Sequence, residues 1–256
     1  MITSSKNAKV KYVARLQAER RFRGREQAFV VEGTRWLTEL VNYGHPIRLV
    51  FYTEDWLLSA NHAAILQQVS VPVQAVNEEV MAAMSDTETP AGVLAVVEMT
   101  VRPLPPQPSL LLILDGVQNP GNLGTMLRTA AAAGVDGVLL GPGCVDAYNP
   151  KVLRGGMGAH LRLPVQALNW AEIEPLLVGL TVWLADVAEG VAYTAVSWQT
   201  PSALIIGSEA WGAGEEAAAL ADGRCTIPMH TATESLNAAL AAGIILFEAA
   251  RQRRPA

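Results

Sequence analysis

The chain has 256 residues, of which half are hydrophobic, so it can bury the core of one large domain or of two ordinary ones. No apolar run reaches the roughly 18 to 20 residues of a membrane span, and the N-terminus lacks the apolar core of a secretory signal. We therefore expect a cytoplasmic protein with no membrane partner. The net charge of -5 would argue against a nucleic-acid partner if it were spread evenly.

The charge is distributed unevenly, with basic residues clustered at the N-terminus. Residues 1–25 hold eight basic residues and one acid, a local balance of +7, which leaves -12 on the rest of the chain. A basic segment on an acidic body can dock a phosphate backbone, although an isolated basic cluster is as often a solvated helix face. The candidate RNA contacts are Lys6, Lys9, Arg20, Arg21, Arg23 and Arg25.

Strand and helix patterns alternate along the first 98 residues. Apolar spacing predicts helices at 8–22, 34–43, 59–69 and 77–84, and strands at 27–33, 47–52, 71–76 and 92–97. This alternation predicts a small α/β domain over residues 1–98. Four prolines in residues 99–109 then predict a stiff, extended linker, because proline can continue neither a helix nor a central strand.

The alternation resumes over residues 110–256, which we expect to form a second α/β domain. Strands are predicted at 110–115, 136–140, 180–185, 203–206 and 224–227. Helices are predicted at 122–133, 150–157, 170–177, 214–220 and 234–252.

The first of three informative segments runs from Asn119 to Ala130. It follows the apolar strand, turns at Pro120-Gly121 and predicts a helix with Asn122 as its N-cap. Arg128 falls among small or apolar neighbours, where an unpaired guanidinium is costly and needs an anionic partner. Arg128 is thus a candidate for holding a phosphate or a carboxylate.

The second and third segments lie far downstream. Gly207 and Gly212 suit a close backbone approach to a ligand, although ordinary turns also use glycine. Glu209, between them, could pair with Arg128. Ser235 and Asn237 flank Leu236 near the last predicted helix, where Thr233 or Ser235 could be the N-cap.

The two cysteines and four histidines predict no metal site. Cys144 and Cys225 fit no metal-ligand spacing, and we expect both to be packed thiols. The histidines form no ligand set. They are His45, His62, His160 and His230.

Together the three segments resemble, in order and spacing, the signature motifs of the SpoU family of the SPOUT superfamily. This family consists of RNA ribose 2'-O-methyltransferases that use S-adenosyl-L-methionine. The strand around Phe29 to Gly33, with the basic segment before it, is similar to the family's substrate-binding domain. The resemblance implies a C-terminal SPOUT-type α/β domain with a deep trefoil knot, a class of topology that is nearly absent from other proteins.

The resemblance also implies roles for individual residues. The catalytic set maps to Arg128, Asn122, Glu209, Ser235 and Asn237. The cofactor contacts map to Gly207, Ile227 and Leu236, with Gly212 and Met229 at the same pocket. Because free arginine is protonated far above neutral pH, we expect Arg128 to orient the hydroxyl and stabilise the alkoxide, while a phosphate or water accepts the proton. The family also implies a homodimer, and the apolar stretch Leu240 to Phe247 is a candidate contact surface that could equally be core.

The leading hypothesis is methylation of a ribose 2'-hydroxyl in structured RNA, with 23S ribosomal RNA favoured by the N-terminal domain. The alternatives are a non-catalytic RNA-binding or ribosome-assembly factor on the same scaffold, or a tRNA 2'-O-methyltransferase. A nucleotide-binding oxidoreductase is disfavoured because no Gly-x-Gly-x-x-Gly turn follows the first strand. Ala210-Trp211 departs from the family pattern, in which small or charged residues are commoner, and the indole could alter access to the pocket or pack at a dimer surface.

Overall fold

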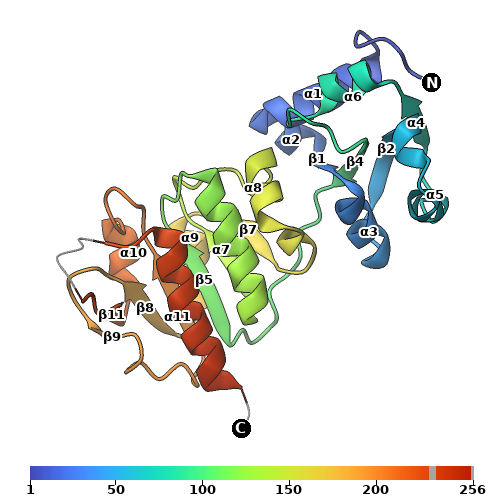
Figure 1. The fold of residues 1–256 in the computed structure, drawn as a ribbon. Helices are drawn as coiled ribbons and strands as arrows, with labels where there is room; N and C mark the ends of the chain where they lie inside the picture. The colour runs from blue at the N-terminus through green and yellow to red at the C-terminus, as the bar shows by residue number, and fades with distance from the viewer. Residues whose placement is uncertain (231–234, 255–256) are drawn as a thin grey trace. The chain divides into compact units, whose positions relative to one another are not determined.

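The computed structural model describes residues 1–230 and 235–254. The chain divides into two compact units. Unit 1 comprises Met1–Thr100 with Tyr148–Leu153, and unit 2 comprises Val101–Ala147 with Arg154–Ala256. Figure 1 follows the chain from the N-terminal helices to the final helix.

Unit 1 is built on a four-stranded sheet of order β1-β4-β2-β3. The β2 and β3 strands are parallel, and β4 is antiparallel to both β1 and β2. The elements are α1 (Ala8–Ala18), α2 (Arg20–Glu26), β1 (Ala28–Glu32), α3 (Thr34–Asn42), β2 (Ile47–Thr53), α4 (Glu54–Leu57), α5 (Ala60–Gln67), β3 (Val73–Val76), α6 (Glu78–Met84) and β4 (Val93–Glu98).

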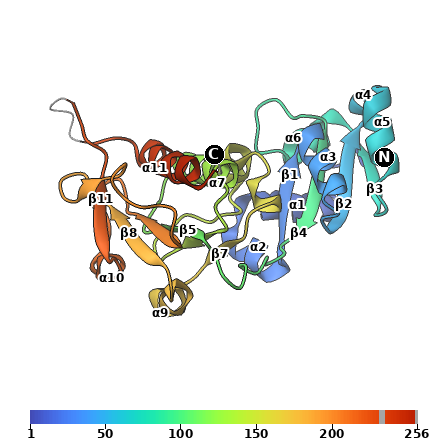
Figure 2. The same cartoon turned by 90° about the horizontal axis from the view of Figure 1, so that it is seen from below.

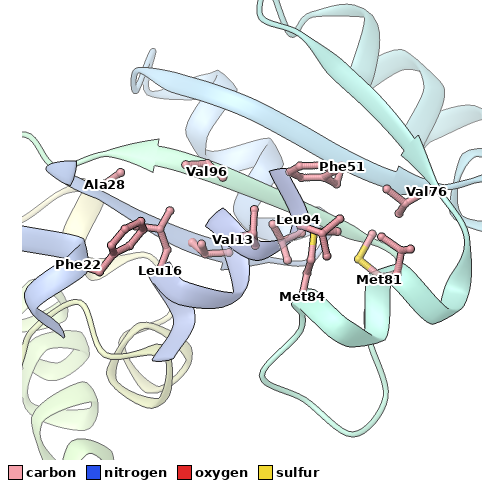
Figure 3. Close-up of a cluster of buried hydrophobic side chains, with 13 residues drawn as sticks. Val13, Leu16, Phe22, Ala28, Phe51, Val76, Met81, Met84, Leu94 and Val96 are labelled. Atoms are coloured by element: carbon pink, nitrogen blue, oxygen red, sulfur yellow. The ribbon is translucent and has the colours of Figure 1, made fainter. Parts of the chain in front are cut away.

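The main core of unit 1 lies between α1, α2 and α6 and one face of this sheet. Figure 3 shows Val13 and Leu16 of α1 beside Met81 and Met84 of α6, with their side chains directed toward the strands. All four are fully buried. The helical spacing of 13 and 16 and of 81 and 84 places each pair on one helix face, which is why these segments form amphipathic helices.

The single helix expected over residues 8–22 is two helices. The chain breaks at Glu19, whose backbone is extended (φ -110°, ψ 109°). Glu19 accepts two hydrogen bonds from the guanidinium of Arg15, at 3.0 Å each. The break lets Phe22 turn inward and join the core. The apolar spacing of this segment did not reveal the break, because the break depends on where Phe22 packs.

Unit 2 contains a seven-stranded sheet of order β7-β6-β5-β10-β8-β11-β9, and every adjacent pair is parallel. The strands are β5 (Leu110–Leu114), β6 (Gly137–Leu140), β7 (Val165–Ala167), β8 (Thr181–Ala185), β9 (Val191–Ala192), β10 (Ser202–Ile206) and β11 (Gly223–Thr226). The helical elements are α7 (Pro120–Ala133), η1 (Ala159–Leu161), α9 (Trp170–Ile173), η2 (Glu174–Leu177), α10 (Glu215–Ala219) and α11 (Ala238–Arg253). The α8 helix (Pro150–Gly156) begins in unit 1 and ends in unit 2. The predicted α/β fold is confirmed.

Helices cover both faces of this parallel sheet. Figure 2 shows α7 and α11 side by side on one face and α9 and α10 on the other. Every residue of the central strands β5 and β10 is buried, as expected for strands covered on both sides. The α7 and α11 helices come close at Gly243, where a β-carbon would lie 3.4 Å from the Cγ2 of Thr129.

Three further predictions differ from the structure in detail. The short strands β7 and β9 were not predicted, because two or three residues are too few to show a period. The helix expected at 170–177 changes at Glu174 into a 3-10 turn, where Pro175 follows. The residues of the proline-rich segment are neither helix nor strand, but Leu104 packs against the core of unit 2, and the Nε2 of Gln166 donates to the carbonyl of Arg102 at 3.0 Å.

Candidate active site

A pocket of about 660 Å³ opens at the carboxyl ends of β8, β10 and β11, which is the edge of a parallel sheet where ligands usually bind. Four segments form its walls, and the last of these leads into α11. They are residues 184–187, residues 206–213, residues 224–227 with Met229, and a wall formed by Ser235, Leu236, Ala238, Ala241 and Ile245. All five residues expected to contact the cofactor line this pocket: Gly207, Gly212, Ile227, Met229 and Leu236.

The turn after β10 needs its glycines. A β-carbon on Gly207 would lie 2.2 Å from the backbone nitrogen of Ala213, so any larger residue would collide with the returning chain. Gly212 has a left-handed φ of +68°, and it exchanges two backbone hydrogen bonds with Ser208, at 2.8 and 3.0 Å. The turn from 208 to 212 is thus a closed, rigid element at the pocket wall.

Asp115, which the sequence reading missed, anchors this turn from β5. Its buried carboxylate accepts a hydrogen bond from the backbone N–H of Gly214 at 2.7 Å, which ties the end of the turn to the neighbouring strand. An acid directly after a fully buried strand was the available signal in the sequence.

The three sequence segments meet through side-chain hydrogen bonds. The Nδ2 of Asn122 donates to the Oε1 of Glu209, and the Nδ2 of Asn237 donates to the Oδ1 of Asn122 at 3.1 Å. The carboxamide of Asn122 is therefore held at both its donor and its acceptor, which fixes its orientation. Glu209 and Asn237, which lie 87 and 115 residues after Asn122 in the sequence, thereby converge with it beside the pocket.

Two predicted N-caps are wrong. The cap of α7 is Asn119, whose Oδ1 accepts from the N–H groups of Gly121 and Asn122, and this leaves the Asn122 side chain available to Glu209. The cap of α11 is Asn237, whose Oδ1 accepts from Ala239 and Leu240. The alternatives were Ser235, which lies at the pocket, and Thr233, which is outside the described residues.

Arg128 is exposed on α7, so the expectation of an apolar environment for its guanidinium is wrong. Across residues 1–230 and 235–254 it forms no hydrogen bond or ion pair, and it does not line the pocket. The expected pairing with Glu209 is therefore wrong within one chain, because Glu209 accepts from Asn122 instead.

Two charged residues at the pocket, Asp186 and Arg224, were also not predicted from the sequence. Arg224 forms an ion pair with Asp186, and both line the pocket. Burial opposes ionisation of Asp186, but hydrogen bonds from the N–H groups of Ala188 and Glu189 and from Arg224 outweigh it, so the pKa of Asp186 is lowered. The adjacent thiol of Cys225 is buried, which raises its pKa to about 12 and keeps this part of the wall neutral. Asp186 directly follows β8, and ligands usually bind at the carboxyl ends of parallel strands. This position was the signal in the sequence that could have identified Asp186.

Five of the six candidate RNA contacts are exposed on unit 1: Lys6, Lys9, Arg20, Arg21 and Arg25. Arg23 is the exception, since only 2% of it is exposed. Its prediction as an RNA contact is therefore wrong. Its Nη1 donates to the carbonyls of Leu16 and Gln17, at 2.7 and 3.0 Å, which satisfies the C-terminal end of α1. A buried guanidinium of this kind is unavailable to a phosphate backbone.

The part of the chain that the structure describes contains neither a cluster of metal ligands nor a membrane-spanning helix. No group of three or more His, Cys, Asp or Glu side chains there could hold a metal ion. None of the described helices is long and apolar enough to cross a membrane.

The fold and the site together define a class of protein, an α/β enzyme with a ligand pocket at the carboxyl edge of a parallel sheet and a polar side-chain network beside it. Comparison with known proteins gives the family. Residues 109–247 match the SpoU rRNA Methylase family, and residues 7–95 match the MRM3-like substrate binding domain. The chain belongs to the SpoU rRNA methylase family and is a methyltransferase.

Relatives match over nearly the whole chain. The 23S rRNA (guanosine(2553)-2'-O)-methyltransferase RlmP of Bacillus subtilis is 34% identical, over 96% of this chain and 97% of its own. The 23S rRNA (uridine(2479)-2'-O)-methyltransferase of Streptomyces viridochromogenes is 30% identical, over 98% of this chain and 92% of its own. Among solved structures, the SpoU methyltransferase AviRb from Streptomyces viridochromogenes, in complex with the cofactor AdoMet, superposes with a TM-score of 0.90 at 29% identity, covering 97% of this chain and 98% of that one.

Proposed function

We propose that this protein methylates a ribose 2'-hydroxyl in structured RNA, using S-adenosyl-L-methionine, and that its substrate is 23S ribosomal RNA. The observation that carries the proposal is the hydrogen-bonded set of Asn122, Glu209 and Asn237 beside the pocket. Both relatives named above act on a ribose 2'-oxygen of 23S rRNA, and they modify different nucleosides, a guanosine and a uridine. The nucleotide that this chain modifies therefore has to be measured.

The pocket fits the proposed cofactor in size and in chemistry. Its volume of about 660 Å³ lies within the usual range for small-molecule sites. Backbone at Gly207 and Gly212 and apolar side chains at Ile227, Leu236 and Met229 would hold the nucleoside and the methionine chain. The carboxylate of Asp186 and the guanidinium of Arg224 offer opposite charges to a zwitterionic amino acid. When bound, the cofactor supplies an electrophilic methyl group on a sulfonium.

The polar residues beside the pocket would position the ribose. Asn122, held by Glu209 and Asn237, presents a fixed amide, and Ser235 lines the pocket as a further hydrogen-bonding group. We assign Arg128 the role of orienting the nucleophilic 2'-hydroxyl and stabilising its developing negative charge, because a guanidinium does not act as a base at neutral pH. The proton passes to a substrate phosphate or to water.

RNA docking is assigned to the exposed basic residues of unit 1: Lys6, Lys9, Arg20, Arg21 and Arg25. Their side chains can approach phosphates without breaking the core, which supports a substrate-binding role for residues 1–98 before the linker at 99–109 and the methyltransferase domain at 110–256. The match of residues 7–95 to a substrate-binding domain supports the same division.

A homodimer is part of the proposal. Arg128 neither lines the pocket nor contacts Glu209 within the described part of one chain, so the role assigned to Arg128 requires that a second copy bring its guanidinium to the site. Leu240 and Phe247 lie two turns apart on α11 and are 54% and 47% exposed, which supports an apolar contact surface on this helix. The trefoil knot and the cytoplasmic location stay predictions. Both cysteines are thiols, as expected in a reducing compartment.

Two alternatives remain as outcomes of the test. A non-catalytic RNA-binding or ribosome-assembly factor would not need the three-residue set that the fold assembles from distant segments. A tRNA 2'-O-methyltransferase would act on transfer RNA in preference to ribosomal RNA.

The decisive experiment measures transfer of labelled methyl from S-adenosylmethionine to unmodified ribosomal and transfer RNA, with the product mapped by resistance to alkaline cleavage. Label in one alkali-resistant position of 23S rRNA is expected. Label in tRNA alone would select the tRNA enzyme. Cofactor binding without label on either RNA would contradict the substrate assignment, and no cofactor binding would favour the non-catalytic factor.

Arg128→Ala is expected to lower methyl transfer by at least about 10³-fold, because it removes a charged donor aimed at the developing alkoxide. Cofactor affinity, measured by calorimetric titration, should stay within a few fold, since Arg128 does not line the pocket. Thr125→Ala, an exposed position one turn earlier on α7, is the control for effects on the helix. A large loss of cofactor affinity in Arg128→Ala would overturn the assigned role.

A further inference from the structure

Trp211 is the most unusual side chain at the pocket, because 90% of it is exposed. Three other tryptophans, Trp36, Trp56 and Trp198, are buried. Tryptophan has one of the largest apolar surfaces of any residue and usually finds a partner. Nothing in the roles assigned above uses this indole.

The backbone that carries Trp211 is fixed. The Oγ of Ser208 accepts from the N–H of Trp211 at 3.2 Å and donates to the carbonyl of Gly212 at 3.1 Å. Together with the paired backbone hydrogen bonds between Ser208 and Gly212, these contacts close the turn around Trp211. A flat aromatic group on a rigid turn loses little conformational entropy when it binds a partner.

The same turn carries Glu209, which holds Asn122 in the polar set. Trp211 and Glu209 both line the methyl-donor pocket. A ribose placed beside Glu209 for methylation therefore brings its own base to the neighbourhood of Trp211. RNA bases that leave a helical stack are commonly recognised by aromatic side chains, and every base offers a π-face for this contact.

We propose that Trp211 stacks on the nucleobase of the nucleotide whose ribose is methylated, and so positions the 2'-hydroxyl against the cofactor pocket. This inference rests on the proposed function. Trp211 acts as a substrate-positioning residue, and because stacking tolerates any base, it fixes orientation more than base identity. A second copy of the chain and the adenine of the cofactor are the competing occupants that the test separates.

The test compares wild type, Trp211→Phe and Trp211→Ala on the RNA that the methyl-transfer assay identifies. Base–aromatic stacking contributes about 1–3 kcal/mol, so Trp211→Ala should raise KM for RNA by roughly 5- to 150-fold, while Trp211→Phe keeps most of the activity. Val178→Ala, which truncates another exposed apolar side chain outside the pocket, should leave KM unchanged.

An RNA lacking the base at the methylated position identifies which base is stacked. The KM of the wild type for this RNA should rise about as much as the KM of Trp211→Ala rises for intact RNA. Combining the base deletion with Trp211→Ala should raise KM no further than either change alone. Fully additive losses would overturn the proposal. So would an unchanged KM in Trp211→Ala, a lost dimer in sedimentation, or a comparable loss of affinity for S-adenosylmethionine.

Binding of RNA without turnover separates this inference from the proposed function. Fluorescence of wild type minus that of Trp211→Phe reports the exposed indole, and single-stranded ribo-oligonucleotides should quench it. Quenching in a protein that transfers no methyl group would support the stacking and reject the enzyme assignment. Methyl transfer without quenching would support the enzyme assignment and reject the stacking.

Discussion

At the scale of the residue, Asn122 shows why an amide is placed at the centre of the site. A carboxamide carries a donor and an acceptor, and here the donor meets the carboxylate of Glu209 while the acceptor meets the amide of Asn237. An aspartate at this position would face Glu209 with like charge and could not donate. Asn237 in turn uses its own oxygen to cap α11, so the site and the start of that helix share one side chain.

A residue-scale prediction concerns Asp115. Asp115→Ala removes the acceptor for the N–H of Gly214, and we expect it to lower the free energy of unfolding by about 1–3 kcal/mol and to weaken binding of S-adenosylmethionine by about tenfold. Urea denaturation and calorimetric titration measure the two effects. Asp115→Asn keeps an acceptor oxygen and should recover most of the affinity.

Asp136 provides the matched control at the opposite end of β5. Its carboxylate accepts from the N–H groups of Ser109 and Leu110, at 2.6 and 2.9 Å, far along the strand from the pocket. Asp136→Ala should destabilise the fold to a similar extent with unchanged cofactor affinity. Equal affinity losses in the two alanine variants would mean that Asp115 acts only through general stability.

At the scale of the element, the basic N-terminal segment divides into a structural part and an exposed part. Glu19 ends α1 and begins α2, and Arg23 then reaches back to the last carbonyls of α1. The guanidiniums of Arg15 and Arg25 lie over the ring of Phe22, at 4.1 and 4.7 Å from its centroid. Because Arg23 is buried, the net charge of the segment overstates the number of cations offered to RNA.

We predict opposite phenotypes for two sets of arginines. Arg23→Ala should lower the free energy of unfolding by about 2–4 kcal/mol, because it leaves buried carbonyls without donors. The double change Arg20→Ala with Arg21→Ala should alter stability by no more than about 0.5 kcal/mol, since both side chains are exposed. Thermal or urea denaturation measures both.

The exposed pair should instead control RNA affinity. Each lost phosphate contact lowers the slope of log affinity against log salt by roughly 0.7–0.9, so the double variant should flatten the slope by up to about 1.8. Filter binding at several salt concentrations gives this slope. An unchanged slope would assign these arginines to a solvated helix face.

At the scale of the whole molecule, the chain presents a pocket and an exposed arginine that do not meet within the described part of one copy. The exposed residues of α11 lie on the helix that packs against α7, which carries Arg128. A dimer formed through this face would place apolar contact and catalytic residues in the same region.

Leu240→Asp combined with Phe247→Asp is therefore expected to give a monomer in analytical ultracentrifugation and to reduce methyl transfer by more than about 100-fold. A charge at such a contact is not tolerated without a partner. Leu58→Asp, at an exposed apolar residue of unit 1, is the matched control and should leave both properties unchanged. A wild type that sediments as a monomer while remaining active would reject the dimer.

Mixing two inactive variants tests whether one site draws on both chains. Arg128→Ala and Glu209→Ala should each be inactive alone. In a mixed dimer with shared sites, one site combines the intact Arg128 of one copy with the intact Glu209 of the other, so activity should partly return. No recovery, with subunit exchange shown by differently tagged chains, would place Arg128 and Glu209 in the same site within one copy.

The sequence by itself determined the family, the α/β alternation and most elements of more than four residues, because apolar periodicity and the order of three motifs are local properties. The resemblance of the three segments to the SpoU motifs also implied that Gly207, Ile227 and Leu236 contact the cofactor, and all three line the pocket. These inferences need only the order of the motifs and the period of each element.

Tertiary structure alone decided how the side chains pair. Asn119 rather than Asn122 caps α7, Glu209 binds Asn122 rather than Arg128, and Arg23 is buried rather than exposed. Each outcome depends on the directions of side chains from segments distant in sequence, and a pattern along one chain carries no such information. The same reason applies to Asp115: its place directly after a strand is visible in the sequence, but its hydrogen-bond partner, the N–H of Gly214, is not.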